Sequence, residues 1–315
     1  MKSTTVGLYP RPEYLQPAIR HFAKGRISAE QLEQEYRKAA KNYIELQEKA
    51  GIDYITSGGF SWDDVITPYA ANTFGFKLGG LIRFFDNNNY YRKPSLTVGL
   101  IAREWKVADE MKKKAELKAI VPGPFTLAKM SEIAPFTTEE FVAIAGQVLN
   151  AEVKALYAAG CRNFQIDEPS LVFEKNIPDE EVDAASIAFA ELRKGIDSQF
   201  CLQTYFGGAG EVYEKLLDFP ADLIGLDFAS VASGKENFDL VKEHGTGGKK
   251  LVAGVIDARN TKMETEADVK KAIEKIRSGM KDGAVILAPN AALEYLPEVI
   301  AEKKVKFLGE VARKL

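Results

Sequence analysis

Short runs of apolar, largely β-branched residues alternate with longer amphipathic stretches along the chain. Each run is almost continuously apolar, as in VILA or LVAGVI, which is typical of a strand buried on both faces. The runs predict eight strands, at residues 4–9, 53–57, 117–121, 163–167, 200–206, 223–228, 251–257 and 284–288.

The stretches between these runs predict helices with defined start and stop signals. Ser28 is followed three residues later by Gln31, a capping box that opens a helix over 28–50, and Gly51 ends it. Thr137 and Glu140 repeat this pattern for a helix over 137–159. The same reasoning predicts further helices at 179–194, 210–217, 266–280 and 298–315.

Eight strands that alternate with helices predict a parallel sheet, and its simplest closed form is a single (β/α)₈ TIM barrel over residues 1–315. A doubly wound open sheet is the alternative. No GxGxxG follows the first strand, which disfavours its dinucleotide-binding version. The first unit carries an N-terminal helical hairpin over 13–50. An insertion over 58–116, which contains FFDNNNYYRKP, separates strands two and three.

Composition and charge narrow the classes of function. Of 315 residues, 46% are hydrophobic and 28% are charged, as in ordinary globular proteins. The 42 Lys and Arg against 45 Asp and Glu leave no basic excess, so we expect neither nucleic acid nor an anionic membrane as partner. No signal-peptide core or membrane-length apolar run is present, and two cysteines form no disulfide framework. We therefore expect a cytoplasmic protein.

Acidic residues follow several predicted strands. Asp167, Asp227 and Asp257 end strands four, six and seven, and Arg259 and Arg11 offer counter-charges. Strand ends of a barrel face one mouth, where clustered carboxylates can act as acids, bases or ligands. We predict Asp167, Asp227 and Arg259 as catalytic. For Asp227 and Asp257, capping of the next helix or ion pairing is an equally supported alternative.

Neighbouring strand ends and loops supply the predicted substrate-binding residues. These are Arg11, Asp63, Asp64, Asn88, Glu168, Tyr205, Asp257, Asn260 and Asn290. The stretch 84–91 could stack a planar ligand or form a packed loop. The Lys-rich stretch 106–118 predicts a solvated helix face.

Histidine and cysteine are too few and too scattered for a metal site or an activated nucleophile. His21 falls in the helical hairpin, and His244 and Cys161 precede strands, away from the mouth. Cys201 opens strand five. We predict surface imidazoles and buried thiols, with no metal ligand among them.

Several segments, taken in order, resemble one family. TTVGLYPRP, KGRISAEQL, RFFDNNNYYRKP, VPGPFTLAKMS, FQIDEPSLV, LQTYFG, LVAGVIDARN and LAPNAALEYLP look like cobalamin-independent methionine synthase. That family has two homologous (β/α)₈ halves. Its C-terminal half binds zinc and homocysteine and transfers a methyl group from methyltetrahydrofolate, whereas its N-terminal half lacks the metal and helps to bind folate polyglutamate. This chain is similar to the N-terminal half.

The resemblance has departures at the functional positions. The family's four zinc-ligand positions correspond to Thr204, Phe206, Asp227 and Ala291, and Asp227 alone could bind a metal. The catalytic histidine aligns with Arg259, and the homocysteine-binding glutamate aligns near Gly59. The basic residues for the folate tail align with Glu13 and Gln16. The resemblance therefore implies no cofactor in this chain, with zinc expected in a partner barrel.

Three functions remain open, in order of preference. The first is an N-type subunit of a split methionine synthase, which would dock onto a separate zinc-bearing barrel and help to bind homocysteine or folate. The second is a stand-alone methyltransferase-like enzyme with another substrate or donor, folate or a methyl-corrinoid protein. The third is a non-catalytic ligand-binding barrel.

Overall fold

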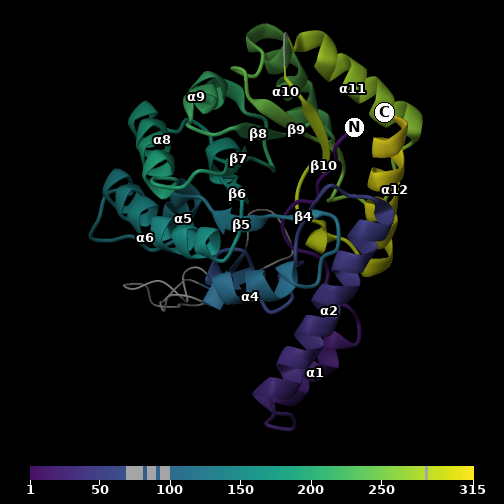
Figure 1. Cartoon of the computed structure of the whole chain (residues 1–315). Helices are drawn as coiled ribbons and strands as arrows, with labels where there is room; N and C mark the ends of the chain where they lie inside the picture. Colours follow the sequence, from purple (N-terminus) through teal and green to yellow (C-terminus); the bar gives the residue numbers. More distant parts are fainter. Residues whose placement is uncertain (69–80, 84–89, 93–99, 281–282) are drawn as a thin grey trace.

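The computed structural model describes residues 1–68, 81–83, 90–92, 100–280 and 283–315 (Figure 1). Helices surround a central group of strands, and α1 and α2 project from one side as a hairpin. Asn88 and most of the aromatic stretch 84–91 lie outside the described residues, so those two predictions stay predictions.

Parallel strands form the centre of the molecule. Six of them pair in the order β10-β9-β8-β7-β6-β5, and β1 pairs with β4. Their bounds are Tyr54–Ile55 (β1), Glu116–Leu117 (β4), Ala119–Pro122 (β5), Asn163–Asp167 (β6), Gln199–Gln203 (β7), Leu223–Asp227 (β8), Lys250–Ile256 (β9) and Val285–Pro289 (β10). A separate antiparallel pair, Leu81–Arg83 (β2) and Tyr90–Arg92 (β3), comes from the insertion.

Parallel bridges join these two sheets into a ring. Ser3 pairs with Leu287 of β10, and Thr4 pairs with Tyr54 of β1. Lys118 alone separates β4 from β5, and its backbone N–H donates to the carbonyl of Ile55 at 3.0 Å. The pairings therefore lead from β5 through β10, the N-terminal segment and β1 back to β4, which supports the predicted (β/α)₈ arrangement.

Two predicted strands are shorter than expected, because a backbone with positive φ interrupts them. The strand over 4–9 is reduced to its bridges, and Gly7 has φ +61°. The strand over 200–206 ends at Gln203, and Phe206 has φ +74°. An extended strand requires negative φ, so the chain turns at both places.

Helices cover the outside of the strands. The capping boxes of Ser28 with Gln31 and of Thr137 with Glu140 are both present, which confirms these helix starts. The helices are Leu15–Ala23 (α1), Ala29–Ala50 (α2), Leu100–Asp109 (α4), Pro124–Lys129 (α5), Thr138–Ala158 (α6), Ser170–Phe173 (α7), Asp179–Leu192 (α8), Tyr213–Asp218 (α9), Val231–His244 (α10), Glu266–Gly279 (α11) and Glu298–Lys314 (α12), with short 3₁₀ turns at Gly210–Val212 (η1) and Leu293–Tyr295 (η2).

The strands present different side chains to their two faces. Phe164 and Phe200 point toward the helices, where their rings stack at 4.9 Å and Phe189 packs against Phe200. Cys201 belongs instead to a small interior cluster with Val6 and other strand residues. Because strand residues alternate between faces, Gln165, Asp167 and Gln203 fall on this interior face.

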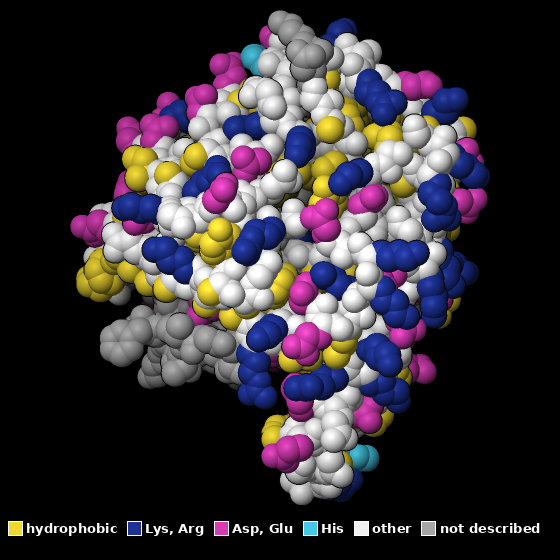
Figure 2. All heavy atoms as spheres, viewed as in Figure 1, with side chains coloured by type: hydrophobic (Ala, Val, Ile, Leu, Met, Phe, Trp, Pro, Cys, Tyr) yellow, Lys and Arg dark blue, Asp and Glu magenta, His cyan; other side chains and the backbone are white. Residues whose placement is uncertain are grey.

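The surface carries no single dominant charge on the face shown in Figure 2, where acidic and basic side chains are intermixed. Among the described residues, no helix is long and apolar enough to cross a membrane.

The two ends of the chain meet where α12 packs against α2. The terminal amino group of Met1 donates to the carbonyl of Ala312 at 2.5 Å. Gly309 lies so close to the end of α2 that an added Cβ would stand 2.0 Å from the carbonyl oxygen of Ala50. A glycine is therefore required for this helix contact.

Gly309→Ala is expected to lower the free energy of unfolding by roughly 1 to 3 kcal/mol, because the added methyl group forces α12 away from α2. Urea denaturation measures the change. Glu310→Ala, at an exposed position of the same helix, is the control and is expected to change it by less than about 0.5 kcal/mol. Equal stability of Gly309→Ala and the unmodified chain would contradict the contact.

Candidate functional site

Asp167 is the centre of a buried polar network at the end of β6. Its Oδ1 accepts a hydrogen bond from Nε2 of Gln165 at 2.7 Å, and its Oδ2 accepts one from the hydroxyl of Tyr205 at 3.1 Å. The side chain is only 2% exposed, and burial raises the pKa of Asp167 to about 7. A carboxyl group that titrates near neutral pH is suited to acid–base work. The structure thus brings together two of the predicted residues, Asp167 and Tyr205.

The network continues below Asp167 to Lys118. The Lys118 ammonium donates to Oε1 of Gln165 at 2.6 Å and to Oγ1 of Thr4 at 2.8 Å. The expectation that Lys118 belongs to a solvated helix face is wrong, because α4 ends at Asp109 and Lys118 links β4 to β5 inside the barrel. The strand prediction over 117–121 already contained the correct signal.

A second acidic group, missed by sequence reasoning, comes from the turn after β10. Glu294 accepts a hydrogen bond from Tyr295, and burial raises the pKa of Glu294 to about 8. The charges of Asp64 and Asp167 raise it further, and Arg11 offsets them. The segment LEYLP, which contributed to the family resemblance, held the signal for this residue. The negative charge of Asp167 therefore raises the pKa of Glu294 across the mouth.

Phe206 covers this part of the mouth in a strained conformation. A positive φ is unusual for a non-glycine residue, and such strain is found preferentially at functional sites. Its ring meets the rings of Tyr205 and Tyr295, with centroids 4.6 and 5.6 Å away, and the Arg259 guanidinium lies 5.0 Å from its centroid. Phe206 also lines an open groove of about 640 Å³ beside α10.

Gln203 leaves one polar atom unsatisfied in the interior. Its Nε2 donates to the carbonyl of Thr204 at 3.0 Å, whereas its Oε1 has no hydrogen-bond partner among the described residues. The side chain is 1% exposed and lies against Gly225, where a Cβ would stand 2.2 Å from this oxygen. A buried acceptor without a donor costs free energy, so a bound group with an N–H or O–H would be favoured there.

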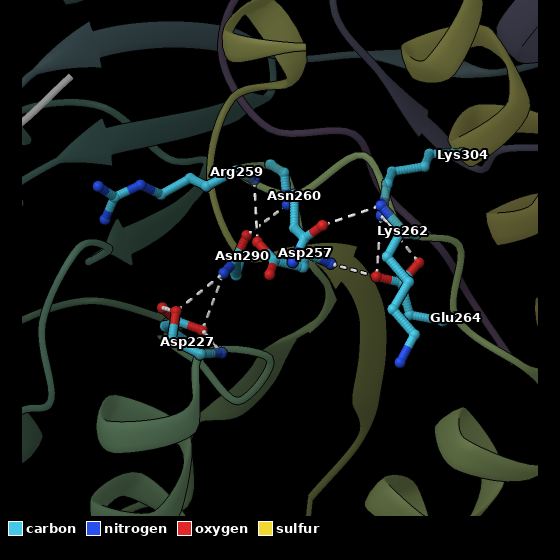
Figure 3. A network of polar contacts seen from close by, with 10 residues as sticks. Asp227, Asp257, Arg259, Asn260, Lys262, Glu264, Asn290 and Lys304 are labelled. Atoms are coloured by element: carbon cyan, nitrogen blue, oxygen red, sulfur yellow. Dashed lines mark hydrogen bonds and ion pairs between the residues drawn. The ribbon is translucent and has the colours of Figure 1, made fainter. Parts of the chain in front are cut away.

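Asp227 holds the loop that follows β8 (Figure 3). Its carboxylate accepts hydrogen bonds from the backbone N–H groups of Ala229 and Ser230, both at 3.0 Å, and from the Ser230 hydroxyl. Asn290 donates to it at 3.1 Å and accepts from the N–H of Ala258 at 2.8 Å. Burial raises the pKa of Asp227. These contacts favour the capping alternative for Asp227, with Asn290 joining three strand ends.

Asp257, Arg259 and Asn260 shape the loop after β9 (Figure 3). Asp257 accepts from the backbone N–H of Arg259 at 2.9 Å, and Asn260 accepts from that of Lys262 at 2.9 Å. The N–H of Asp257 donates to Glu264, which pairs with the buried Lys304 at 2.9 Å. In Figure 3 the Arg259 side chain extends away from this pair, so it remains available to the mouth.

The other predicted residues hold loops and helix starts. Glu168 accepts hydrogen bonds from the backbone N–H groups of Phe125 and Thr126, at 3.0 and 2.7 Å, and burial raises the pKa of Glu168 to about 7. Asp64 accepts from the N–H groups of the two turn residues Ile66 and Thr67. Arg11 donates to the carbonyls of Phe60 and Trp62 and pairs with Asp63 at 3.0 Å.

The donor set at the mouth does not fit zinc. Thr204 donates its hydroxyl to the carbonyl of Gly225 and Asp227 is engaged by its own loop, while Phe206 and Ala291 carry no ligand atom. Within the described residues, no three His, Cys, Asp or Glu side chains are arranged to hold a metal. Cys161 and Cys201 are buried free thiols, and burial raises the pKa of each to about 12.

Asp167→Asn is expected to flatten the pH dependence of stability. Because the folded-state pKa of about 7 lies above the ordinary 3.8, the folded protein binds an extra proton between these values, and the free energy of unfolding falls as pH rises through that window. Removing the titration abolishes up to about 4 kcal/mol of this fall. Urea denaturation from pH 4 to 8 measures it, with the 61%-exposed Asp63, changed to Asn, as control. Parallel curves for the two variants would refute the assignment.

Asp227→Ala is expected to destabilise the chain by roughly 2 to 4 kcal/mol, since Ala229, Ser230 and Asn290 lose a shared buried acceptor. Thermal denaturation and hydrogen exchange at the start of α10 measure the effect. An unchanged melting temperature would contradict the proposed loop-holding role.

Comparison with known proteins gives a consistent family. The model of the cobalamin-independent synthase N-terminal domain matches residues 79–281. The methionine synthase of Saccharolobus solfataricus is 30% identical over 317 residues, which cover 98% of this chain and 93% of that protein. That of Sulfurisphaera tokodaii is 29% identical over 312 residues, 97% of this chain and 89% of that protein.

A solved structure supports the fold. The B12-independent methionine synthase of a Shewanella species, in complex with selenomethionine, superposes with a TM-score of 0.81 at 19% identity, covering 99% of this chain and 97% of that one. Sequence and fold thus agree, and the chain belongs to the cobalamin-independent methionine synthase family.

Proposed function

We propose that this chain binds the amino-acid substrate of a cobalamin-independent methyl transfer at its barrel mouth and acts together with a separate zinc-bearing barrel. One observation carries the proposal: the mouth has a buried, hydrogen-bonded carboxylate, Asp167. The family resemblance supports it, because the zinc-ligand positions correspond to Thr204, Phe206, Asp227 and Ala291, of which Asp227 alone could bind a metal. The mouth can therefore bind a charged substrate, but its described residues offer no metal site that would activate a thiol.

The mouth has the polar groups that an amino acid requires. When it is ionised, the carboxyl group of Asp167 attracts an ammonium group. The oxygens of Glu294, whose pKa burial raises to about 8, and the free Oε1 of Gln203 can accept hydrogen bonds from that group. Arg259 offers a counter-charge for the carboxylate of the substrate, and the ring of Phe206 offers an apolar surface for its side chain. The selenomethionine bound by the Shewanella relative is a ligand of this chemical class.

Activation of a thiol is the step that this chain lacks the means to perform. A thiolate forms near neutral pH when a metal or a nearby base stabilises it. Arg259, which the resemblance aligns with the family's catalytic histidine, carries hydrogen-bond donors and no acceptor atom that could act as a base. A zinc-bearing barrel would supply the thiolate, and this chain would supply part of the substrate or methyl-donor site.

A second candidate is a stand-alone methyltransferase. The two archaeal relatives named methionine synthase have nearly the same length as this chain, which covers 93% and 89% of them. A single barrel of this size therefore carries that name elsewhere in the family. In this case the substrate or donor, folate or methyl-corrinoid, would differ from that of the two-barrel enzymes.

Isothermal titration with homocysteine and methionine tests the binding step. We expect binding by the unmodified chain and a loss of at least tenfold in affinity for Asp167→Asn, because the ammonium group loses a buried charge. Asp183→Asn, which removes a 63%-exposed carboxylate on α8, away from the mouth, is the control and should keep the affinity.

A methyl-transfer assay separates the two candidates. The chain is supplied with homocysteine and either methyltetrahydrofolate or a methyl-corrinoid protein, with and without a zinc-bearing barrel of the same family. Turnover that appears only with the added barrel supports the split enzyme, and turnover by the chain alone supports the stand-alone enzyme. Neither binding nor turnover would reject both and leave a non-catalytic barrel.

A further inference from the structure

Lys118 is a charged residue in a place where barrels ordinarily have apolar ones. The interior of a (β/α)₈ barrel is filled mainly by branched aliphatic side chains. Lys118 is 9% exposed and occupies the junction of β4 and β5, with Thr4 on one side and Gln165 on the other. A buried ammonium group is costly unless nearby groups compensate for its lost hydration. Its position therefore needs an explanation.

The side-chain amide of Gln165 connects Lys118 to Asp167 and is held in a single orientation. The carbonyl oxygen of its amide accepts from the ammonium at 2.6 Å, and its amino group donates to the carboxylate at 2.7 Å. A cation selects the carbonyl end of an amide and an anion selects the amino end, so the two charges fix the same orientation. Gln165 is 1% exposed, and water does not compete for these bonds.

The other ionisable groups around Asp167 do not supply a positive charge. Glu168 follows it directly, Glu294 faces it from the turn after β10, and both are acidic. Tyr205 donates a hydrogen bond, Tyr295 lies beside Glu294, and Cys201 lies near Lys118 as a thiol. Among the described residues, Lys118 is the cation whose charge lowers the pKa of Asp167.

We propose that Lys118 is a positioning residue that sets the ionisation of Asp167 from the floor of the barrel, through the amide of Gln165. This deepens the proposed function, because it names the residue that controls the charge of the substrate site. Only the identity of the ligand rests on the proposed function. Burial raises the pKa of Asp167, whereas the hydrogen bonds from Gln165 and Tyr205 and the charge of Lys118 lower it. Burial in turn lowers the pKa of Lys118 to about 8.

The two pKa values define a pH range in which Asp167 and Lys118 are both charged. Below pH 7 Asp167 takes up a proton, and above pH 8 Lys118 gives one up, so the charged pair is favoured between these values. A ligand with an ammonium group would bind best when Asp167 is ionised and Lys118 still balances it.

Infrared titration of the carboxyl groups of ¹³C-aspartate-labelled protein tests the inference without any ligand. Subtraction of the Asp167→Asn spectrum isolates the band of Asp167. We expect its midpoint to rise by at least one pH unit in Lys118→Met, which keeps the length of the side chain and removes its charge. Lys249→Met removes another partly buried lysine, which donates to the carbonyls of Phe219 and Ala221, and should leave the midpoint unchanged.

Two further variants keep the test decisive if Lys118→Met does not fold. Gln165→Met retains the lysine but breaks the connection, and it should raise the midpoint as well. Lys118→Arg keeps the charge and should hold the midpoint closer to that of the unmodified chain than Lys118→Met does. An Asp167 midpoint that stays within 0.3 of a pH unit in both Lys118→Met and Gln165→Met would overturn the inference.

Ligand binding separates this inference from the proposed function. If homocysteine and methionine fail to bind but the midpoint still shifts, the proposed function fails and the role of Lys118 stands. If they bind and the midpoint does not shift, the proposed function stands and the role of Lys118 is wrong. With both correct, the pH at which affinity is half-maximal shifts with the Asp167 midpoint.

Discussion

The burial of charge inside the barrel is the constraint on which the rest of the site depends. Lys118, Gln165, Asp167 and Tyr205 form one hydrogen-bonded chain from the floor toward the mouth, and each is at least 91% buried. An unpaired charge in this environment would cost several kcal/mol, so every member needs its neighbours. The parallel pairing of β5 with β6 and of β6 with β7 brings the start of β5, where Lys118 lies, and the end of β7, which Tyr205 follows, beside Gln165 and Asp167 of β6.

Most of the other acidic residues near the mouth stabilise structure. Asp227 and Glu168 accept backbone N–H groups at the starts of loops or helices, and Glu264 pairs with Lys304 under the loop after β9. These contacts fix the segments that follow the strands. The rigid frame leaves Asp167, Glu294 and Arg259 to face the mouth, where an amino-acid ligand would meet both signs of charge.

Relationship to a metal-dependent family does not require retention of the metal site. The barrel has loop anchors at its strand ends and a buried carboxylate at the end of β6, and both are held by hydrogen bonds within the protein. A barrel can lose its ligands and keep its fold because loop anchors such as the Asp227 contacts involve protein groups only. One barrel architecture can therefore carry different sites, and the function has to be argued from the site residues.

The sequence by itself determined the alternation of strands with helices and the starts of two long helices. Nearly continuous apolar runs identified the strand positions, two capping boxes identified the helix starts, and the ordered family segments pointed to the strand ends that include Asp167. These signals are local, because they depend on spacing within one element. The interruptions at Gly7 and Phe206 depend instead on backbone conformations that the apolar pattern does not contain.

Only the tertiary structure decided which polar residues act together. The sequence predicted Lys118 on a solvated helix face and did not single out Glu294, yet the charges of both residues act on Asp167. Conversely, Asp227 and Asp257 met the sequence criteria for a mouth residue, and their carboxylates are bound by adjacent loops. Whether a carboxylate faces a ligand or a backbone N–H depends on the path of the chain after the strand, and strand pairing over long sequence separations sets that path.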